Sequence, residues 1–271
     1  MSEERDWQAI WAATERVVAG GHPRSRPGGD DADTYGGGPA AERLTARVAA
    51  LLGKEAAVWM PSGTMAQQIA LRIHAERRGA RTVAFHPHCH LDVHEERGYE
   101  HLHGLHAKLL GQRNRLVEPA DLDAVHEPIA AVLLELPQRD LGGRLPAWEE
   151  LVTLCDKVRE LGAALHLDGA RLWQCGPFYE RGLAEVAALF DTVYVSFYKD
   201  LGAAAGCALA GPRDVLDEAR ASGRSGTAGG CSASIRCSSP PSAAWTASSR
   251  AWRRTSSTRA RSARRSPGST T

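Results

Sequence analysis

The sequence has no apolar run of the roughly 18 to 20 residues that a membrane-spanning helix needs, although 43% of its 271 residues are hydrophobic. Residues 1–18 contain early acidic side chains and no apolar stretch before a small-residue cleavage site, so we expect no secretory signal. The six cysteines follow no regular spacing and are expected to be reduced thiols. These absences together predict a cytoplasmic chain without a membrane partner.

Acidic residues and lysine are missing from residues 221–271, which contain nine arginines. The whole chain has 33 basic and 32 acidic side chains, so residues 1–220 hold 24 basic and 32 acidic ones, a net charge of −8. An acidic body repels phosphate, and only the last segment is basic enough to bind it. We therefore expect no nucleic-acid partner.

The segment 221–271 also lacks leucine, valine, phenylalanine, tyrosine and methionine, and it contains 14 serines. Such a composition cannot form a core and predicts a disordered basic tail. The genetic code suggests a cause. Codons for cysteine and tryptophan begin TG and most serine codons begin TC, so reading one base earlier converts them into codons for apolar residues. We interpret 221–271 as a frameshifted, disordered tail that replaces a C-terminal small domain, now lost or scrambled.

The rest of the chain alternates between helical and strand patterns. Residues 1–39, with an amphipathic helix at 5–20 and a Gly-, Pro- and Asp-rich loop, predict an N-terminal arm. Residues 40–215 are expected to form a large domain. Helices are expected at 40–52, 64–78, 147–161 and 181–189, and strands at 56–60, 81–85, 130–135, 163–167, 192–197 and 206–210. This order predicts an α/β domain with a mainly parallel sheet covered on both faces.

Three polar sites follow predicted strands, where open α/β sheets bind their ligands. The first is Pro61-Ser62-Gly63-Thr64, directly before a helix, where free N–H groups and the helix dipole suit a phosphate. Ser62 or Thr64 fits an ordinary helix N-cap equally well. Taken alone, this segment predicts either a phosphate site or a cap.

The other two sites place a carboxylate and an amine at strand ends. Asp168 precedes Gly169 and is a turn residue, a metal ligand or the partner of a cationic ring nitrogen. Lys199 follows a strand beside Ser196; most lysines are solvated, but one at this position is a candidate for covalent bonding to a carbonyl group. A phosphate anchor, a carboxylate and an amine in this order are what pyridoxal 5′-phosphate requires.

With these residues in place, the sequence resembles the threonine aldolase and β-eliminating lyase family of fold-type-I pyridoxal-phosphate enzymes. The resemblance runs from about Thr34 to about Ala219. It is most specific in TYGGGPAAERL, PSGTMAQQIAL, HLDGARLW and VSFYKDLGA. It implies that residues 40–215 are the cofactor-binding large domain, that the substrate is an amino acid, and that the enzyme is a homodimer or homotetramer.

The resemblance also implies a role for each matching residue. Lys199 corresponds to the lysine that binds the cofactor covalently, Asp168 to the partner of the ring nitrogen, and Arg171 to the arginine that binds the substrate carboxylate. The remaining cofactor contacts are Ser62, Gly63, Thr64 and Ser196.

Two further segments match residues that complete the family's site. His90 is followed five residues later by Glu95, the spacing of the family's ring-stacking histidine, and His88 is the alternative. Tyr35 and Gly36 match a segment that reaches into the site of the neighbouring subunit. All five are therefore expected near substrate or cofactor.

The sequence departs from the family in two places. Threonine aldolases commonly carry a histidine where this chain has Gln138, after the acidic strand end at Glu135, and an amide cannot accept a proton at neutral pH. The C-terminal domain, which supplies another carboxylate-binding arginine, has no counterpart in 221–271. The expected reaction is cleavage of a β-hydroxy-α-amino acid such as threonine to glycine and an aldehyde. β-Elimination and a catalytically impaired remnant are the alternatives.

Residues 86–106 contain seven histidines and Cys89, which raises the question of zinc. The histidines follow strand or loop spacing, and no compact cysteine pair completes a tetrahedral set, so no metal is expected. His166 is interpreted as a core residue within its strand. Cys155 and Cys175 are interpreted as buried thiols.

Overall fold

The computed structural model describes residues 38–203 and 205–224. They belong to the first of two units, Met1–Ser232, whereas the second unit, Ala233–Thr271, lies outside the described residues. The expected helix at 5–20, Tyr35, Gly36 and the segment beyond 224 also lie outside them.

Within the described ranges, seven strands form one sheet. They are β1 (Ala56–Met60), β2 (Thr82–Phe85), β3 (His106–Leu109), β4 (Ile129–Glu135), β5 (Ala164–Gly169), β6 (Thr192–Ser196) and β7 (Cys207–Gly211). Their order across the sheet is β1-β7-β6-β5-β4-β2-β3. β7 is antiparallel to β1 and β6, and all other neighbouring pairs are parallel. The predicted mainly parallel sheet is confirmed.

All six predicted strands are present within two residues of their expected bounds. The central strands are buried along their length except for Glu135 at the end of β4, which is why they read as continuous apolar runs. The sequence analysis missed β3, whose residues HAKL are only partly buried at the edge of the sheet. A short edge strand needs few apolar residues and therefore leaves little signal.

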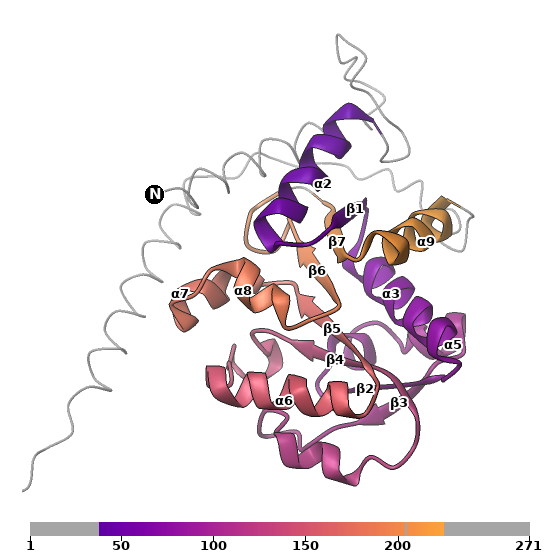
Figure 1. Ribbon diagram of the computed structural model, residues 1–271, viewed down its shortest axis with the longest axis vertical. Coiled ribbons are helices and arrows are strands. Elements are labelled where there is room, and N and C mark those ends of the chain that lie inside the picture. The colour runs from indigo at the N-terminus through magenta and orange to yellow at the C-terminus, as the bar shows by residue number, and fades with distance from the viewer. Residues whose placement is uncertain (1–37, 204, 225–271) are drawn as a thin grey trace, which may run out of the picture. The chain divides into compact units, whose positions relative to one another are not determined.

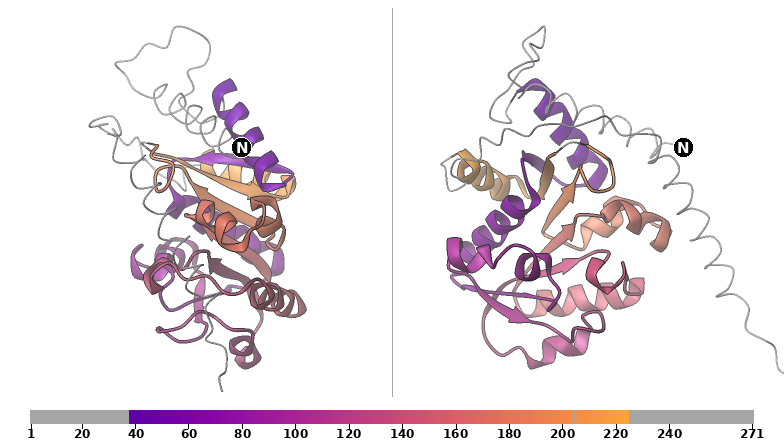
Figure 2. Two further views of the ribbon diagram at one scale, coloured as in Figure 1. Left: turned by 90° about the vertical axis from the view of Figure 1, so that its left-hand side faces the viewer. Right: turned by 180° about the vertical axis from the view of Figure 1, so that it is seen from behind.

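Helices cover both faces of the sheet (Figures 1 and 2). One face carries α3 (Gly63–Arg78), α5 (Gly98–His103) and α9 (Arg213–Arg224). The other carries α2 (Pro39–Leu52), α6 (Trp148–Glu160), α7 (Cys175–Tyr179) and α8 (Leu183–Ala188). A short helix, α4 (His90–Val93), follows β2. In the part of the chain that the structure describes, no helix is long and apolar enough to span a bilayer.

The large domain extends beyond the expected end at residue 215, because α9 continues to residue 224. The buried stripe of α9 consists of Val215, Leu216 and Ala219, packed with residues of β1, β7 and α3. At the far end of α3, Arg77 forms ion pairs with Asp214 and Glu218 of α9, at 2.7 and 2.6 Å. The many charges of α9 hide its narrow apolar stripe, so the sequence pattern did not mark it as a helix of the domain.

The strand directions bring several chain segments to one edge of the sheet. β1 runs in the same direction as β6 because β7 is antiparallel to both. The carboxyl ends of β1, β2, β4, β5 and β6 therefore share one edge, which is where ligands of open α/β sheets bind. The predicted site residues lie at or just beyond these ends.

Candidate active site

Asp168 lies at the carboxyl end of β5, beside Glu135 of β4 and Tyr194 of β6 in the strand register. It is only 2% exposed, and its Oδ1 accepts the backbone N–H of Ala170 at 3.0 Å. Among the described residues it forms no ion pair within 4 Å. The end of β5 thus presents a buried carboxylate that has no cation in direct contact.

The surroundings of Asp168 show which groups face it. Burial raises the pKa of Asp168, and the charges of Lys199 and His90 and a hydrogen bond from Gln67 of α3 act in the opposite direction. The predicted lysine, aspartate and histidine are therefore neighbours. Gln67 was not predicted; its Oε1 is buried and has no hydrogen-bond partner among the described residues.

Lys199 stands on the turn that follows β6. Its backbone N–H donates to Oγ of the buried Ser196 at 3.3 Å, and the Ser196 carbonyl accepts Nε1–H of Trp173 at 3.0 Å. The charge of Lys199 lowers the pKa of both Glu135 and Asp168, although burial dominates the pKa of each. The amine is therefore close enough for its charge to act on two carboxyl groups at the edge of the sheet.

The N-terminus of α3 follows β1 at the same edge. Ser62 is the N-cap of α3, and its Oγ accepts the N–H of Met65 at 3.3 Å, so the capping alternative holds for this residue. The N–H groups of Gly63 and Thr64 have no acceptor in the described ranges. A Cβ at Gly63 would lie 2.1 Å from Oη of Tyr194, which explains the glycine by packing. Two helix N–H groups thus remain free to bind an anion.

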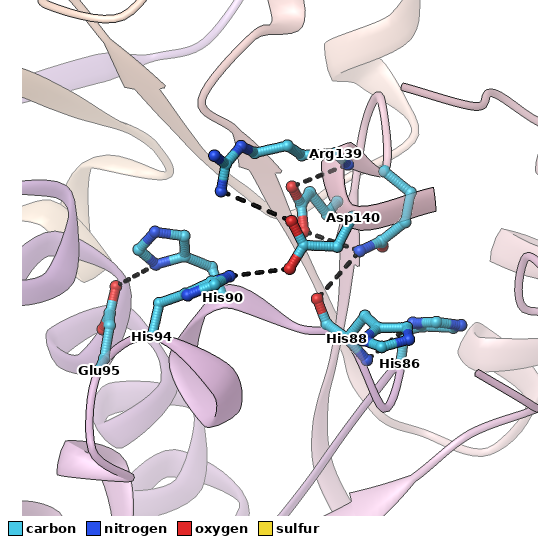
Figure 3. Close-up of polar contacts among 9 residues, drawn as sticks. His86, His88, His90, His94, Glu95, Arg139 and Asp140 are labelled. Atoms are coloured by element: carbon cyan, nitrogen blue, oxygen red, sulfur yellow. Dashed lines mark hydrogen bonds and ion pairs between the residues drawn. The ribbon is translucent and has the colours of Figure 1, made fainter. Parts of the chain in front are cut away.

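His90 is the first residue of α4, and its side chain is hydrogen-bonded through one ring nitrogen (Figure 3). Its Nδ1–H donates to Oε1 of Glu95 at 2.8 Å, and the other carboxylate oxygen accepts Nε2–H of Gln68 at 3.3 Å. The expected pairing of His90 with Glu95 is present. His88 instead donates its backbone N–H to Nδ1 of His86 at 2.9 Å, which favours His90 over the alternative.

Gln138 lies just after β4 and is 3% exposed. Its Nε2–H₂ donates to the carbonyl of His88 at 3.1 Å and to Oε2 of Glu135 at 2.9 Å. Burial, with the nearby Asp168, raises the pKa of Glu135 to about 8. Glu135 was not predicted as a site residue, although its position at the carboxyl end of a central strand was the available signal.

A second histidine–carboxylate pair lies next to the first. Nε2–H of His94 donates to Oδ2 of Asp140 at 2.8 Å, and the His94 ring centroid is 5.0 Å from that of His90 (Figure 3). The sequence analysis did not single out either residue. His94 follows His90 by four residues across one short helix, which was a usable signal, but Asp140 comes from the turn after β4.

Arg171 follows β5 and is half-buried. Its charge lowers the pKa of Asp200, although burial of that carboxyl has the larger, opposite effect. Gln174 Nε2–H₂ lies 3.3 and 3.2 Å from the two oxygens of Asp200. Arg171 is thus brought to the same edge, next to the turn that carries Lys199.

The other histidines of residues 86–106 do not gather into a metal site. Nε2–H of His86 points to the carbonyls of Gln112 and Arg115, each at 2.9 Å, so this ring fastens a loop. No group of three or more His, Cys, Asp or Glu in the described ranges is arranged to hold a metal ion. His166 is fully buried, as are the free thiols of Cys155 and Cys175, in agreement with their interpretation as core.

The family model of β-eliminating lyases matches residues 27–267. This chain belongs to the β-eliminating lyase family. Among similar proteins, the low-specificity L-threonine aldolase 1 of Arabidopsis thaliana is 29% identical over 202 residues, covering 70% of this chain and 56% of the plant protein. The low specificity L-threonine aldolase of Escherichia coli K12 is 30% identical over 210 residues, covering 71% of this chain and 58% of its own length.

Two similar solved structures show that the chain has the fold of fold-type-I pyridoxal-phosphate enzymes. A Listeria monocytogenes protein described as an L-allo-threonine aldolase is 41% identical with a TM-score of 0.70, covering 80% of this chain and 63% of its own. An Exiguobacterium protein described as an aromatic amino acid β-eliminating lyase/threonine aldolase is 40% identical with a TM-score of 0.71, with coverages of 80% and 65%. The chain spans little more than half the length of the curated relatives named above.

The β-eliminating lyase family uses pyridoxal 5′-phosphate, and the described residues fit it. The carboxylate of Asp168 is buried without an ion pair, which suits a cationic ring nitrogen. Lys199 supplies an amine beside it, and the free N–H groups of Gly63 and Thr64 suit the phosphate. The unpartnered Oε1 of Gln67 adds a polar atom that the protein itself leaves unused.

Proposed function

We propose that this chain is a pyridoxal-phosphate-dependent carbon–carbon lyase that cleaves a β-hydroxy-α-amino acid to glycine and an aldehyde. One observation carries the proposal: the carboxylate of Asp168 is buried at the carboxyl edge of the sheet and forms no ion pair among the described residues, while the charge of Lys199 acts on it. A buried carboxylate needs a positive partner. The family's cofactor supplies one in its ring nitrogen.

Each residue has a role in this proposal. Lys199 would be the residue that holds the cofactor covalently, and the amino group of the substrate would displace its amine. Asp168 holds the ring nitrogen in its protonated form, and Arg171 binds the substrate carboxylate. The phosphate is held by Ser62, Gly63, Thr64 and Ser196. When bound, the cofactor takes up the electron pair that is released as the Cα–Cβ bond breaks.

His90 lies against the ring in the proposal, with Glu95 fixing its orientation. A carboxylate hydrogen-bonded to Nδ1–H sets the tautomer and leaves Nε2 with a lone pair. Tyr35 and Gly36 reach the site of a neighbouring subunit, so the working form is a homodimer or homotetramer. The buried free thiols of the described residues suit a reducing compartment, and we propose a cytoplasmic location.

β-Elimination is the second candidate, and Gln138 favours it. Cleavage of the Cα–Cβ bond needs a base for the β-hydroxyl proton, and an amide cannot serve. Gln138 is also engaged by its contacts to His88 and Glu135, so it is a fixed part of the wall of the site. A substrate with a leaving group at Cβ would not need this base.

Absorbance spectra of the purified full chain with pyridoxal phosphate test the proposal. A band in the visible range that borohydride removes is expected, followed by release of acetaldehyde from threonine or allo-threonine. Release of pyruvate and ammonia from serine or cysteine without acetaldehyde would favour β-elimination. Absence of the visible band would contradict both.

We further propose that residues 221–271 are translated in a shifted reading frame, which would make this chain an impaired remnant. The nucleotide sequence decides this: stop codons in the alternative frame within the segment would contradict it. Restoring that frame is expected to raise the rate of aldehyde release in the same assay. Equal rates in both forms would contradict the remnant.

A further inference from the structure

The pair formed by His94 and Asp140 lies beside His90 and has no role in the function proposed above. His94 ends α4, and Asp140 lies in the 3-10 turn Arg139–Leu141 that follows β4. Their side chains are 38% and 24% exposed, so solvent and a small ligand can reach them. The His94 ring lies 5.0 Å from the His90 ring, tilted by 49°. The pair therefore borders the space next to His90.

The hydrogen bond between the two residues sets the chemical form of His94. The Asp140 carboxylate accepts a hydrogen bond from Nε2–H of His94 at 2.8 Å. In the neutral ring, Nδ1 then carries the lone pair, and no donor among the described residues contacts it. A neutral imidazole oriented by a carboxylate, with its second nitrogen free, is the arrangement of a general base.

The same turn explains why a base is needed from elsewhere. Gln138 stands where threonine aldolases commonly carry a histidine, and its amide is bound to the His88 carbonyl and to Glu135. It can neither accept a proton nor turn toward a substrate without breaking both bonds. Asp140, two residues further along this turn, instead accepts a hydrogen bond from His94 at the end of α4. The chain thus retains an imidazole at this wall although the histidine of the turn is replaced.

We infer that His94, oriented by Asp140, is the base that accepts the β-hydroxyl proton of the substrate. This inference rests on the proposed lyase function. The hydroxyl proton passes to Nδ1 of His94, the O–H electron pair forms the carbonyl of the aldehyde, and the Cα–Cβ bond breaks. Its electron pair stays with the α-carbon fragment, which takes up one proton and leaves as glycine. The two products together contain the same atoms as the substrate, so no oxidant or reductant is required.

The charges around the pair are consistent with this role. Burial alone would raise the pKa of Asp140, but the hydrogen bond from His94, together with the charge of Arg139, holds it below its usual range. Asp140 is therefore ionised near neutral pH and can accept the hydrogen bond from Nε2–H of His94. On its other side His94 faces the ring of His90.

The test uses the full chain loaded with pyridoxal phosphate and the variants His94→Asn, Asp140→Asn and His101→Asn. His101 is an exposed histidine of α5 and serves as the matched control. We expect His94→Asn to lower kcat for threonine about 100-fold and to change the shape of the kcat/KM profile against pH. Asp140→Asn should have a smaller effect in the same direction, and His101→Asn none.

Two readouts do not depend on turnover. Stopped-flow absorbance gives the affinities of threonine and of 2-aminobutyrate, which lacks the hydroxyl, before cleavage occurs. Their ratio should fall about three- to tenfold in His94→Asn and stay unchanged in His101→Asn. In the cofactor-free chain, nitrogen NMR should show the neutral His94 ring protonated on Nε2, and Asp140→Ala should give a mixture of both tautomers.

The outcomes separate the inference from the function on which it rests. If wild type releases aldehyde but His94→Asn keeps its rate, pH profile and affinity ratio, the inference is overturned and the proposed lyase stands. A loss confined to His90→Asn would then identify His90 as the base. If wild type shows no spectral response to any amino acid, the proposed function is overturned and the inference falls with it.

Discussion

Two buried polar clusters lie on the same two strands, β5 and β6, and they differ in kind. In the first, Nδ1 of His166 and Nε2 of His74 both lie 2.8 Å from Oγ1 of Thr192. In the second, toward the carboxyl ends, Asp168 and Lys199 face each other across the edge of the sheet. The first cluster is closed by hydrogen bonds to one hydroxyl, whereas in the second the buried Asp168 forms no ion pair among the described residues.

The difference shows how the same fold separates stability from chemistry. Burial lowers the pKa of His74 to about 4 and that of His166 to about 3, so both rings of the first cluster are neutral. Both rings share the Thr192 hydroxyl, and Nε2 of His166 has no hydrogen-bond partner among the described residues. The second cluster buries a carboxylate whose pKa is raised by burial. A site of this second type destabilises the empty protein and becomes favourable when a ligand completes it.

The sharpest test of the second cluster is Lys199→Ala. We expect complete loss of covalently bound cofactor, because no other amine faces Asp168, and little change in stability, because Lys199 is only half-buried. Mass spectrometry after borohydride reduction gives the result. Lys54→Ala is the control: Nζ of Lys54 donates to the Phe190 carbonyl, at the amino-terminal side of β6. Cofactor trapped on Lys54, Lys108 or Lys157 would contradict the assignment.

The first cluster should make the free energy of unfolding depend on pH. The folded pKa values of His74 and His166, about 4 and about 3, lie below the unfolded value of about 6.5. Their contribution is therefore complete above that value and is lost as the pH falls below it, by about 1.4 kcal/mol per pH unit for each histidine. Urea unfolding between about pH 7 and about pH 5 measures the slope, and His74→Asn should reduce it. A flat profile would mean that these rings are protonated in the folded state.

Asp168→Asn should lower turnover and raise the melting temperature of the cofactor-free protein. Turnover is expected to fall about 100-fold, because a neutral partner no longer keeps the ring nitrogen protonated. The cofactor-free variant should melt at a higher temperature than wild type. A raised carboxyl pKa means that ionised Asp168 disfavours the folded state at neutral pH, and the amide removes this charge. Equal turnover, or a lower melting temperature with normal turnover, would contradict the contrast between the clusters.

Thr192→Val tests the closed cluster with the smallest change. Valine has the shape of threonine without the hydroxyl, so both imidazoles lose a partner while buried. The free energy of unfolding should fall by about 1 to 3 kcal/mol, with cofactor binding unchanged. Thr192→Ser, which retains the hydroxyl, should stay closer to wild type in the same urea titrations. If serine and valine are equally destabilising, packing and not the hydrogen bonds holds the cluster.

The sequence was sufficient to predict where the candidate site residues that follow single strands lie in the fold; their roles remain proposals. Asp168 and Lys199 each end an apolar run, and the polar residue at the end of a buried strand is visible without a structure. The helix start at Ser62 was visible for the same reason, since a capping residue separates a strand from a helix pattern. The sheet class followed from the alternation of these runs.

Contacts between distant segments could not be predicted in this way. His94 and Asp140 are in contact because a short helix after β2 faces a turn after β4. The sequence pattern of the helix does not indicate the turn, and that of the turn does not indicate the helix. Gln67 faces Asp168 because α3 crosses the end of β5. Such pairings depend on tertiary packing, which local propensity and periodicity do not encode.

The position of β1 at one end of the sheet has a consequence for how the molecule is made. β1 is the first strand of the chain, yet its partner is β7, with Ala56 opposite Gly211 and Met60 opposite Cys207. On the ribosome, β1 must wait until nearly the whole domain has been synthesised before it can pair. The turn at Ser62, which we propose to bind the phosphate, follows β1 directly. The strand that positions this turn therefore pairs late, through a contact of high sequence separation that forms slowly.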